Sequence, residues 1–166
     1  DVYKRQATTR PETMLGDTAV AVNPKDKRYK NLVSKNVILP IVEKKIKIIA
    51  DNYADPEQGT GAVKITPAHD FNDYEVGIRN KLELINIFTE DGKINENAPS
   101  EYIGLDRFEA RKKIISELKN KNLFVKDEDI KNKVPYGDRS NSIIEPFLTE
   151  QWFADAEKLS IKAKKI

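Results

Sequence analysis

Two short stretches of the sequence hold most of the side chains that could do chemistry. The first is TTRPETMLGD, positions 8–17, with three threonines, an Arg-Pro step, two carboxylates and one glycine. Pro11 favours an extended Arg10 and can begin a helical turn, which Gly16 is placed to end. A helix start beside an arginine and threonine hydroxyls can hold an anion or a sugar-phosphate. The alternative, which these residues alone favour, is an ordinary turn in which Arg10 pairs with Glu12.

The second stretch is GTGAVKITPAHDFNDYEVG, positions 59–77. A strand is predicted over Ala62–Thr66, and it turns Val63 and Ile65 to one face and Lys64 to the other. The strand therefore presents an ammonium group away from the hydrophobic core.

A helix is predicted directly after this strand, and it begins with two carboxylates. Asp70 and Asp73 lie three residues apart, on one side of the helix start, where the helix dipole favours negative charge. A purely structural role as N-cap and first-turn acid is the alternative, and it applies more to Asp70 than to Asp73. His69 is predicted to be a buried histidine and not a base or metal ligand, since the chain has one histidine and no cysteine.

The composition limits the kinds of chemistry open to these residues. The 166 residues, 39% of them hydrophobic, are enough for one domain with a core. The absence of cysteine excludes disulfides, thiolate metal sites and a cysteine nucleophile, and no metal or cofactor is expected. No apolar run approaches the length of a membrane span or a signal peptide, so we expect a cytoplasmic protein. The net charge of +2 does not indicate a nucleic-acid partner.

Local basic clusters interrupt this nearly neutral sequence. They occur at residues 25–30, 44–47 and 162–165. We interpret them as solvated surface in preference to RNA contacts.

Short strands and a few helices must position the two chemical stretches. Strands are predicted at residues 19–22, 37–42, 46–50, 62–66 and 84–88, and Asp91-Gly92 after the last of them predicts a hairpin turn. Helices are predicted from Asn23-Pro24 to about residue 33, from an Asp106 cap to about residue 120, and over residues 150–163. In the second helix, Phe108, Ile115 and Leu118 form the predicted core stripe. The fold class is α+β, with a closed or strongly curved sheet.

Taken together, the two stretches resemble one protein family. ATTRPETMLGDTAVAVNP, then GTGAVKITPAHDFNDYEVG and IEPFLTEQWF, occur in the order seen in the editing domain of class I valyl-tRNA synthetases. The related leucyl and isoleucyl domains differ in the run Met14-Leu15-Gly16-Asp17 and at Lys64. The resemblance assigns residues 7–148 to the editing domain, 1–6 to an unassigned stub, and 149–166 to a helix leading back toward an absent catalytic domain.

The family implies a β-barrel core with peripheral helices that hydrolyses threonine wrongly esterified to valine tRNA. An apolar pocket cannot strongly reject an isostere that adds a hydroxyl, a limit of which valyl-tRNA synthetases are a known example. A second site that hydrogen-bonds the hydroxyl can reject valine instead, since valine would leave buried polar groups unpaired. The implied partners are the mischarged 3′ end of the tRNA and the rest of the synthetase.

Site residues carry over by position. Lys64, Asp73 and Thr13 are the implied catalytic residues, and Thr8, Thr9, Arg10 and Asp70 the implied substrate-binding residues. Asp73 would bind the α-ammonium or side-chain hydroxyl, and Lys64 the hydroxyl or the ester and ribose oxygens. Asp70 would bind the ammonium or hold the loop. A positioned water, with help from the terminal ribose hydroxyl, would attack the activated ester while Lys64 or backbone amides stabilise the oxyanion.

Two other hypotheses stay open. The isolated chain could bind the tRNA end without turnover, because the missing catalytic halves orient the RNA. Alternatively, every motif could be a cap or a turn around an inert barrel. Without those halves, the chain is not expected to aminoacylate tRNA by itself.

Overall fold

A four-stranded sheet lies at the centre of the domain. The computed structural model describes residues 4–131 and 133–163. The strands are β1 (Ala19–Val22), β2 (Asn36–Ile38), β3 (Lys45–Ala50) and β4 (Ala62–Ile65), in the order β2-β3-β1-β4. β1 and β3 are parallel, and the other two pairings are antiparallel. The predicted strands at 19–22, 46–50 and 62–66 are thus confirmed to within one residue.

The predicted closed barrel is not observed. Within the described residues, β2 and β4 each pair with a single strand, so the sheet is open. All four residues of β1 are buried, as expected of a central strand covered on both faces. The fold is a small mixed α/β domain.

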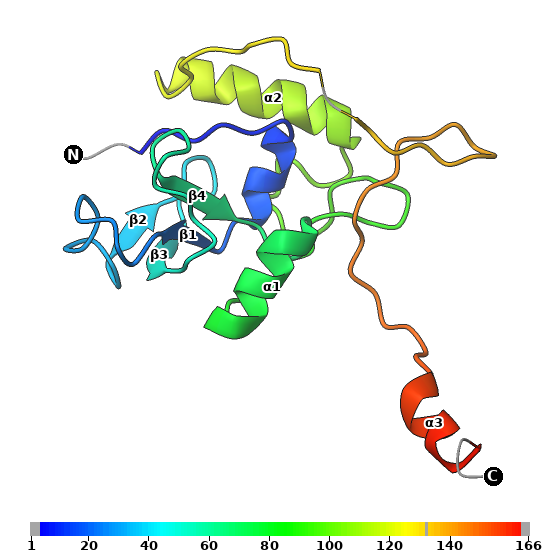
Figure 1. The fold of residues 1–166 in the computed structure, drawn as a ribbon. Coiled ribbons are helices and arrows are strands. Elements are labelled where there is room, and N and C mark those ends of the chain that lie inside the picture. Colours follow the sequence, from blue (N-terminus) through cyan, green and yellow to red (C-terminus); the bar gives the residue numbers. More distant parts are fainter. Residues whose placement is uncertain (1–3, 132, 164–166) are drawn as a thin grey trace.

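Four helical elements accompany the sheet (Figure 1). They are the 3-10 helix η1 (Pro11–Gly16), α1 (Phe71–Asn80), α2 (Arg107–Asn120) and α3 (Ala156–Ala163). Pro11 begins η1 as predicted. The segment before α3 extends away from the other elements, and α3 begins later than the predicted residue 150. Among the described residues, no helix has both the length and the apolarity needed to cross a membrane.

Residues 23–33 form successive turns instead of the predicted helix. The side chain of Asn23 accepts a hydrogen bond from the Lys25 amide, and that of Asp26 accepts one from the Arg28 amide. Such local side-chain bonds offer the backbone an alternative to helical hydrogen bonds. The prediction was wrong because it weighed the Asn-Pro start and not these competing acceptors.

Two predicted strands are also wrong. The strand at 37–42 ends at Ile38, because the chain turns sharply through left-handed conformations at Ile41 and Glu43. Of the predicted strand at 84–88, only Phe88 makes a β-bridge, to Ile94. In this segment, side chains form hydrogen bonds with backbone groups that a strand would use for pairing. One example is the Ile87 amide, which donates to His69. The predicted turn at Asp91-Gly92 is confirmed, with the Thr89 amide bonded to the Lys93 carbonyl.

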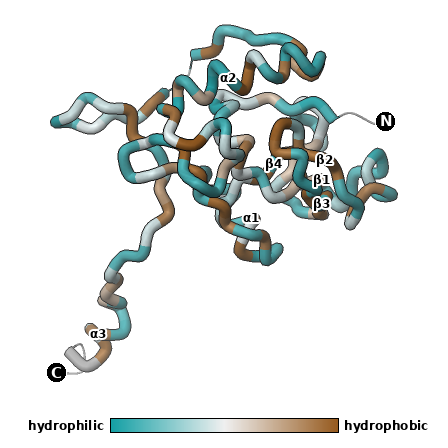
Figure 2. Tube along the Cα trace, turned by 180° about the vertical axis from the view of Figure 1, so that it is seen from behind, coloured by the Kyte–Doolittle hydropathy of each residue, from teal (hydrophilic) through white to brown (hydrophobic). Residues whose placement is uncertain are grey.

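The core is divided between the two faces of the sheet and the space beneath α2. Figure 2 shows hydrophobic and hydrophilic segments alternating along α2. Ala110 and Ile114 are its buried residues, whereas Phe108 is 37% exposed, so the predicted stripe is displaced around the helix. Leu118 packs at the edge of this cluster. The guanidinium groups of Arg107 and Arg111 lie over the Phe108 ring, which explains why this aromatic side chain can remain outside the core.

Candidate functional site

A buried polar cluster lies where η1 leads into β1 and β4 leads into α1. β4 contributes Lys64, and Thr66 follows that strand directly. Asp73 comes from the first turn of α1, and Asp17 ends η1. The exposed fraction is 4% for Asp17, 0% for Thr66 and 3% for Asp73.

Thr66 is in contact with the other three members of the cluster. The Lys64 Nζ lies 2.7 Å from Thr66 Oγ1 and 3.5 Å from Asp73 Oδ2. The Thr66 amide donates to the same Asp73 oxygen at 2.9 Å, and the Thr66 hydroxyl donates to Asp17 Oδ1. The structure therefore brings together Lys64 and Asp73, the two charged residues that were predicted to be catalytic.

Burial raises the pKa of both carboxyl groups. Desolvation raises the pKa of Asp17 to about 7, and the charge of Lys64 only partly opposes this. Desolvation also raises the pKa of Asp73, against the charge of Lys64 and the Thr66 amide bond. Asp73 forms the ion pair with Lys64, whereas Asp17 is connected to the lysine through the Thr66 hydroxyl.

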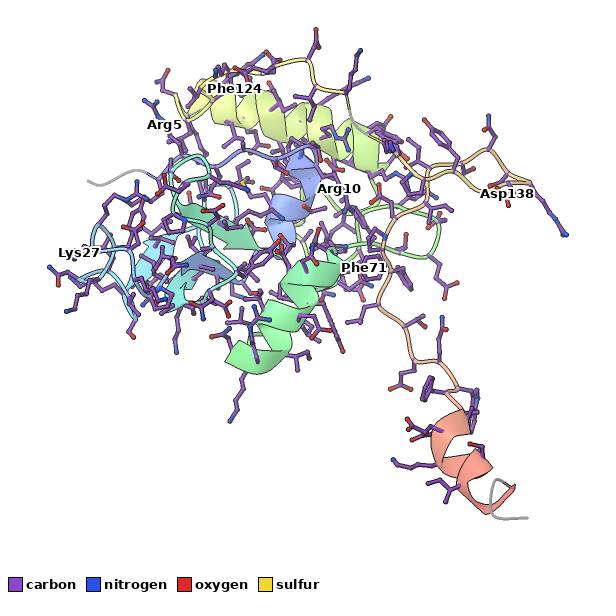
Figure 3. All side chains as sticks on the ribbon, in the orientation of Figure 1. Arg5, Arg10, Lys27, Phe71, Phe124 and Asp138 are labelled. Atoms are coloured by element: carbon purple, nitrogen blue, oxygen red, sulfur yellow. The ribbon has the colours of Figure 1, made fainter. Side chains whose placement is uncertain are left out.

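Arg10 lies beside the turn that leads into α1. Its Nη1 donates to the His69 carbonyl at 2.8 Å, and its Nη2 forms an ion pair with Glu145. Figure 3 places Arg10, where η1 begins, near Phe71, where α1 begins. The predicted pair between Arg10 and Glu12 is wrong: the fully buried Glu12 is held by Arg111 of α2, with two hydrogen bonds of 2.6 and 2.7 Å.

The three threonines of the first stretch differ in exposure. Thr13 is buried, and its hydroxyl donates to the Arg10 carbonyl at 3.0 Å. Thr8 is exposed, and its hydroxyl accepts the Arg10 amide at 3.0 Å. Thr9 is exposed as well. Thr8 and Thr13 therefore contact the backbone of Arg10, which they help to orient.

Asp70 and His69 have the structural roles that the sequence predicted. The Asp70 carboxylate caps α1 by accepting the amides of Asn72 and Asp73. His69 is buried, and its Nε2 accepts the Ile87 amide at 3.0 Å. Desolvation and the nearby Arg10 and Lys64 charges lower its pKa to about 3, so His69 is neutral at pH 7.

Three residues near the cluster were missed as site candidates. Asp17 and Thr66 stand within the two quoted motifs. Asp17 lies just before the predicted strand at 19–22 and Thr66 ends the one at 62–66, so a polar residue beside an apolar strand was the available signal. Burial and the charges of Asp73 and Asp70 raise the pKa of Tyr53. No sequence pattern links Tyr53 to α1.

A shallow cavity of about 170 Å³ opens beside the cap of α1. Its lining is mostly apolar and consists of Pro67, Ala68, Asp70, Phe71, Tyr74, Pro146, Phe147 and Leu148. Residues 67–74 and 146–148, which are far apart in sequence, therefore meet next to Asp70. In the part of the chain that the structure describes, no group of three or more histidine or acidic side chains could hold a metal ion.

Comparison with known proteins identifies the family of this chain. The family model described as the editing domain of leucyl-tRNA synthetase matches residues 27–106. The valine-tRNA ligase of Pelagibacter ubique is 82% identical over 160 residues, or 96% of this chain and 18% of that protein. The valine-tRNA ligase of Caulobacter vibrioides is 58% identical over 159 residues, with the same coverage of 96% and 18%. This chain belongs to the family of valyl-tRNA synthetase editing domains.

The fold of this editing domain is also seen in a solved relative. The crystal structure of GlLeuRS-CP1 superposes with a TM-score of 0.54 at 16% identity, over 74% of this chain and 82% of that chain. At this identity the comparison shows a shared fold. The editing domain spans 18% of the length of the two curated relatives described above.

Proposed function

We propose that this domain hydrolyses threonine that has been wrongly esterified to the 3′ end of valine tRNA, as one part of a longer cytoplasmic synthetase. The family assignment supports the general activity, which is aminoacyl-tRNA editing. The observation that supports the choice of substrate is the contact of Lys64 with Asp73 and Thr66 at the end of β4, with the buried Asp17 on the other side of the Thr66 hydroxyl.

The charges of the cluster suit an aminoacyl ester. An α-ammonium group near Asp73 would share this carboxylate with Lys64, whose Nζ lies 3.5 Å from it. The Lys64 ammonium can donate to the threonine side-chain hydroxyl or to an ester oxygen. Valine in the same place would leave buried polar groups without a partner, which disfavours its hydrolysis.

The surrounding residues are proposed to hold the nucleotide end of the substrate. Arg10 would hold the terminal adenosine, with Thr8 and Thr9 beside it on the exposed side. Thr13 would act through the Arg10 carbonyl to which it donates. Asp70 would assist the ammonium from its place at the cap of α1.

The proposed reaction needs no side-chain nucleophile. A water oxygen bonds to the ester carbonyl carbon, the bond from that carbon to the ribose oxygen breaks, and the ribose oxygen takes the proton. Asp73 would orient the water, and Lys64 would stabilise the negative charge that develops on the carbonyl oxygen.

The test is a deacylation assay with threonyl-tRNA and valyl-tRNA side by side. We expect faster hydrolysis of threonyl-tRNA, and a loss of about a hundredfold in kcat/KM for Lys64→Ala, since a donor to the oxyanion is removed. Asp73→Asn should also lower the rate while it keeps an oxygen for the Thr66 amide. Lys93→Ala, in the exposed turn paired with Asp91, is the matched lysine control.

Three results would contradict the proposal: equal rates for the two esters, full activity in Lys64→Ala, or equal effects of Lys64→Ala and Lys93→Ala. Binding of the tRNA end without hydrolysis would favour the alternative hypothesis, in which the isolated chain binds the tRNA end without turnover. Circular dichroism melting of each variant separates a lost site from a lost fold.

A further inference from the structure

Thr66 is the common support of the two charged residues in the proposed site. Its amide donates to Asp73 Oδ2 at 2.9 Å, and its hydroxyl oxygen lies 2.7 Å from Lys64 Nζ. The direct contact between Lys64 and Asp73 is longer, at 3.5 Å. The threonine hydroxyl is therefore the closest polar contact of the lysine among the described residues.

The carboxyl group of Asp17 decides which way this hydroxyl points. A hydroxyl has one hydrogen to donate and lone pairs that accept. Thr66 donates its hydrogen to Asp17 Oδ1, so its lone pairs are left to accept from the Lys64 ammonium. Without an acceptor at residue 17, the hydroxyl could turn its hydrogen toward the lysine and repel it.

Asp17 itself is firmly held. Its amide donates to the Met14 carbonyl at 3.1 Å at the end of η1. The neighbouring Thr18 amide donates to the Ile65 carbonyl at 2.9 Å, which joins this junction to the end of β4. Asp17 is 4% exposed, so water does not compete for its contact with Thr66.

We propose that Asp17 and Thr66 are positioning residues, which hold the Lys64 ammonium in place for the hydrolysis of the aminoacyl ester. The inference rests on the proposed function for its kinetic consequence. Its structural part, that a hydroxyl oriented by Asp17 holds the lysine, can be measured without any activity.

The experiment compares three substitutions that change the contacts of the Thr66 hydroxyl with Asp17 and Lys64 in different ways. Thr66→Val removes the hydroxyl and keeps the shape. Thr66→Ser keeps the hydroxyl, and Asp17→Asn keeps an accepting oxygen while it removes the charge. Thr18→Val is the matched control, because Thr18 is also buried and its hydroxyl has no hydrogen-bond partner in the described part of the chain.

For threonyl-tRNA we expect Thr66→Val to lower kcat/KM by about ten- to a hundredfold, the range for one hydrogen bond to a charged group. Thr66→Ser and Asp17→Asn should remain within about threefold of the unmodified chain, and Thr18→Val should be unchanged. A Thr66→Val protein that folds and keeps its full rate would overturn the proposal. So would an Asp17→Asn rate as low as that of Thr66→Val, because the charge and not the hydrogen-bond direction would then matter.

A second readout follows the Lys64 ammonium directly by ¹⁵N NMR, with its signal assigned from Lys64→Arg. A hydrogen-bonded ammonium exchanges slowly with water, so the signal should persist in Thr66→Ser and Thr18→Val and vanish in Thr66→Val. If the unmodified chain shows no hydrolysis, the proposed function fails for this chain, while the NMR signal still decides whether Thr66 holds the lysine. An unchanged signal in Thr66→Val would refute the positioning role.

Discussion

At the scale of single residues, the cluster around Thr66 makes protonation part of the stability of the domain. Burial raises the pKa of Asp17 to about 7, from an ordinary value of 3.8. The native state therefore keeps a proton that the unfolded chain releases between these two values. Asp17 contributes stability that is fully present below about pH 4 and is lost as the pH rises through about 7.

This predicts the effect of Asp17→Asn, which has no proton to lose. Its free energy of unfolding, relative to that of the unmodified chain, should rise between pH 4 and pH 7 by an amount on the order of a few kcal/mol. Urea denaturation at a series of pH values measures the difference.

His69 also titrates differently in the folded and unfolded states. The lowered pKa of His69, about 3, works in the opposite direction, since stability falls as the pH drops from 6.5 toward 3. His69 is present in both proteins, so its effect cancels in the difference. Parallel stability curves for the two proteins would show that Asp17 is ionised throughout this range.

At the scale of elements, α1 and α2 begin in the same way but differ in what lies beside them. Asp70 caps α1 by accepting two backbone amides, and Asp106 caps α2 by accepting the Phe108 amide. Asp70 also lines the shallow cavity near the polar cluster. The two caps therefore form a natural pair for separating stability from substrate binding.

Asp70→Ala and Asp106→Ala should each lower the free energy of unfolding by about 1 kcal/mol, the usual cost of a lost N-cap. Only Asp70→Ala should also raise KM for threonyl-tRNA. Asp70→Asn keeps an N-cap, so it should recover the stability that Asp70→Ala loses. If the Asp70 carboxylate contacts the substrate ammonium, Asp70→Asn should not recover the KM, because it lacks the charge. Equal KM values for the two alanine variants would leave Asp70 with its structural role alone.

The same scale shows where element prediction from sequence works. β1, β3, β4, the caps of α1 and α2 and the proline start of η1 follow from short-range patterns, and the structure confirms them. Residues 23–33 differ because the side chains of Asn23 and Asp26 bond the backbone locally, and residues 84–88 differ because the distant His69 accepts the Ile87 amide. These bonds compete with helix and strand, and composition does not reveal which of them wins.

At the scale of the whole molecule, the sheet and its covering helices form one body, from which the segment before α3 extends (Figure 1). The large apolar side chains of this segment are exposed: Trp152 by 105% and Phe153 by 89%. Glu145, near the start of the segment, is tied to the body through Arg10.

The sole tryptophan of the chain, Trp152, reports on this segment. We expect the folded domain to emit like an indole in water, and urea to leave the emission wavelength nearly unchanged while far-ultraviolet circular dichroism shows unfolding. Emission at shorter wavelength in the folded protein, shifting on denaturation, would show that Trp152 is packed. A dilution series separates packing on the same molecule from packing on a second copy.

The sequence by itself determined the family, the charged residues of the proposed site and most of the elements that hold them. Residue types and short spacings are enough for this, because caps, turns and strand alternation depend on neighbours along the chain. Only the tertiary structure decided that the sheet is open, that Glu12 pairs with Arg111, and that Thr66 joins Asp17, Lys64 and Asp73. The contacts of Glu12 with Arg111 and of Asp17 with Thr66 join segments far apart in sequence, and their geometry depends on how the core packs.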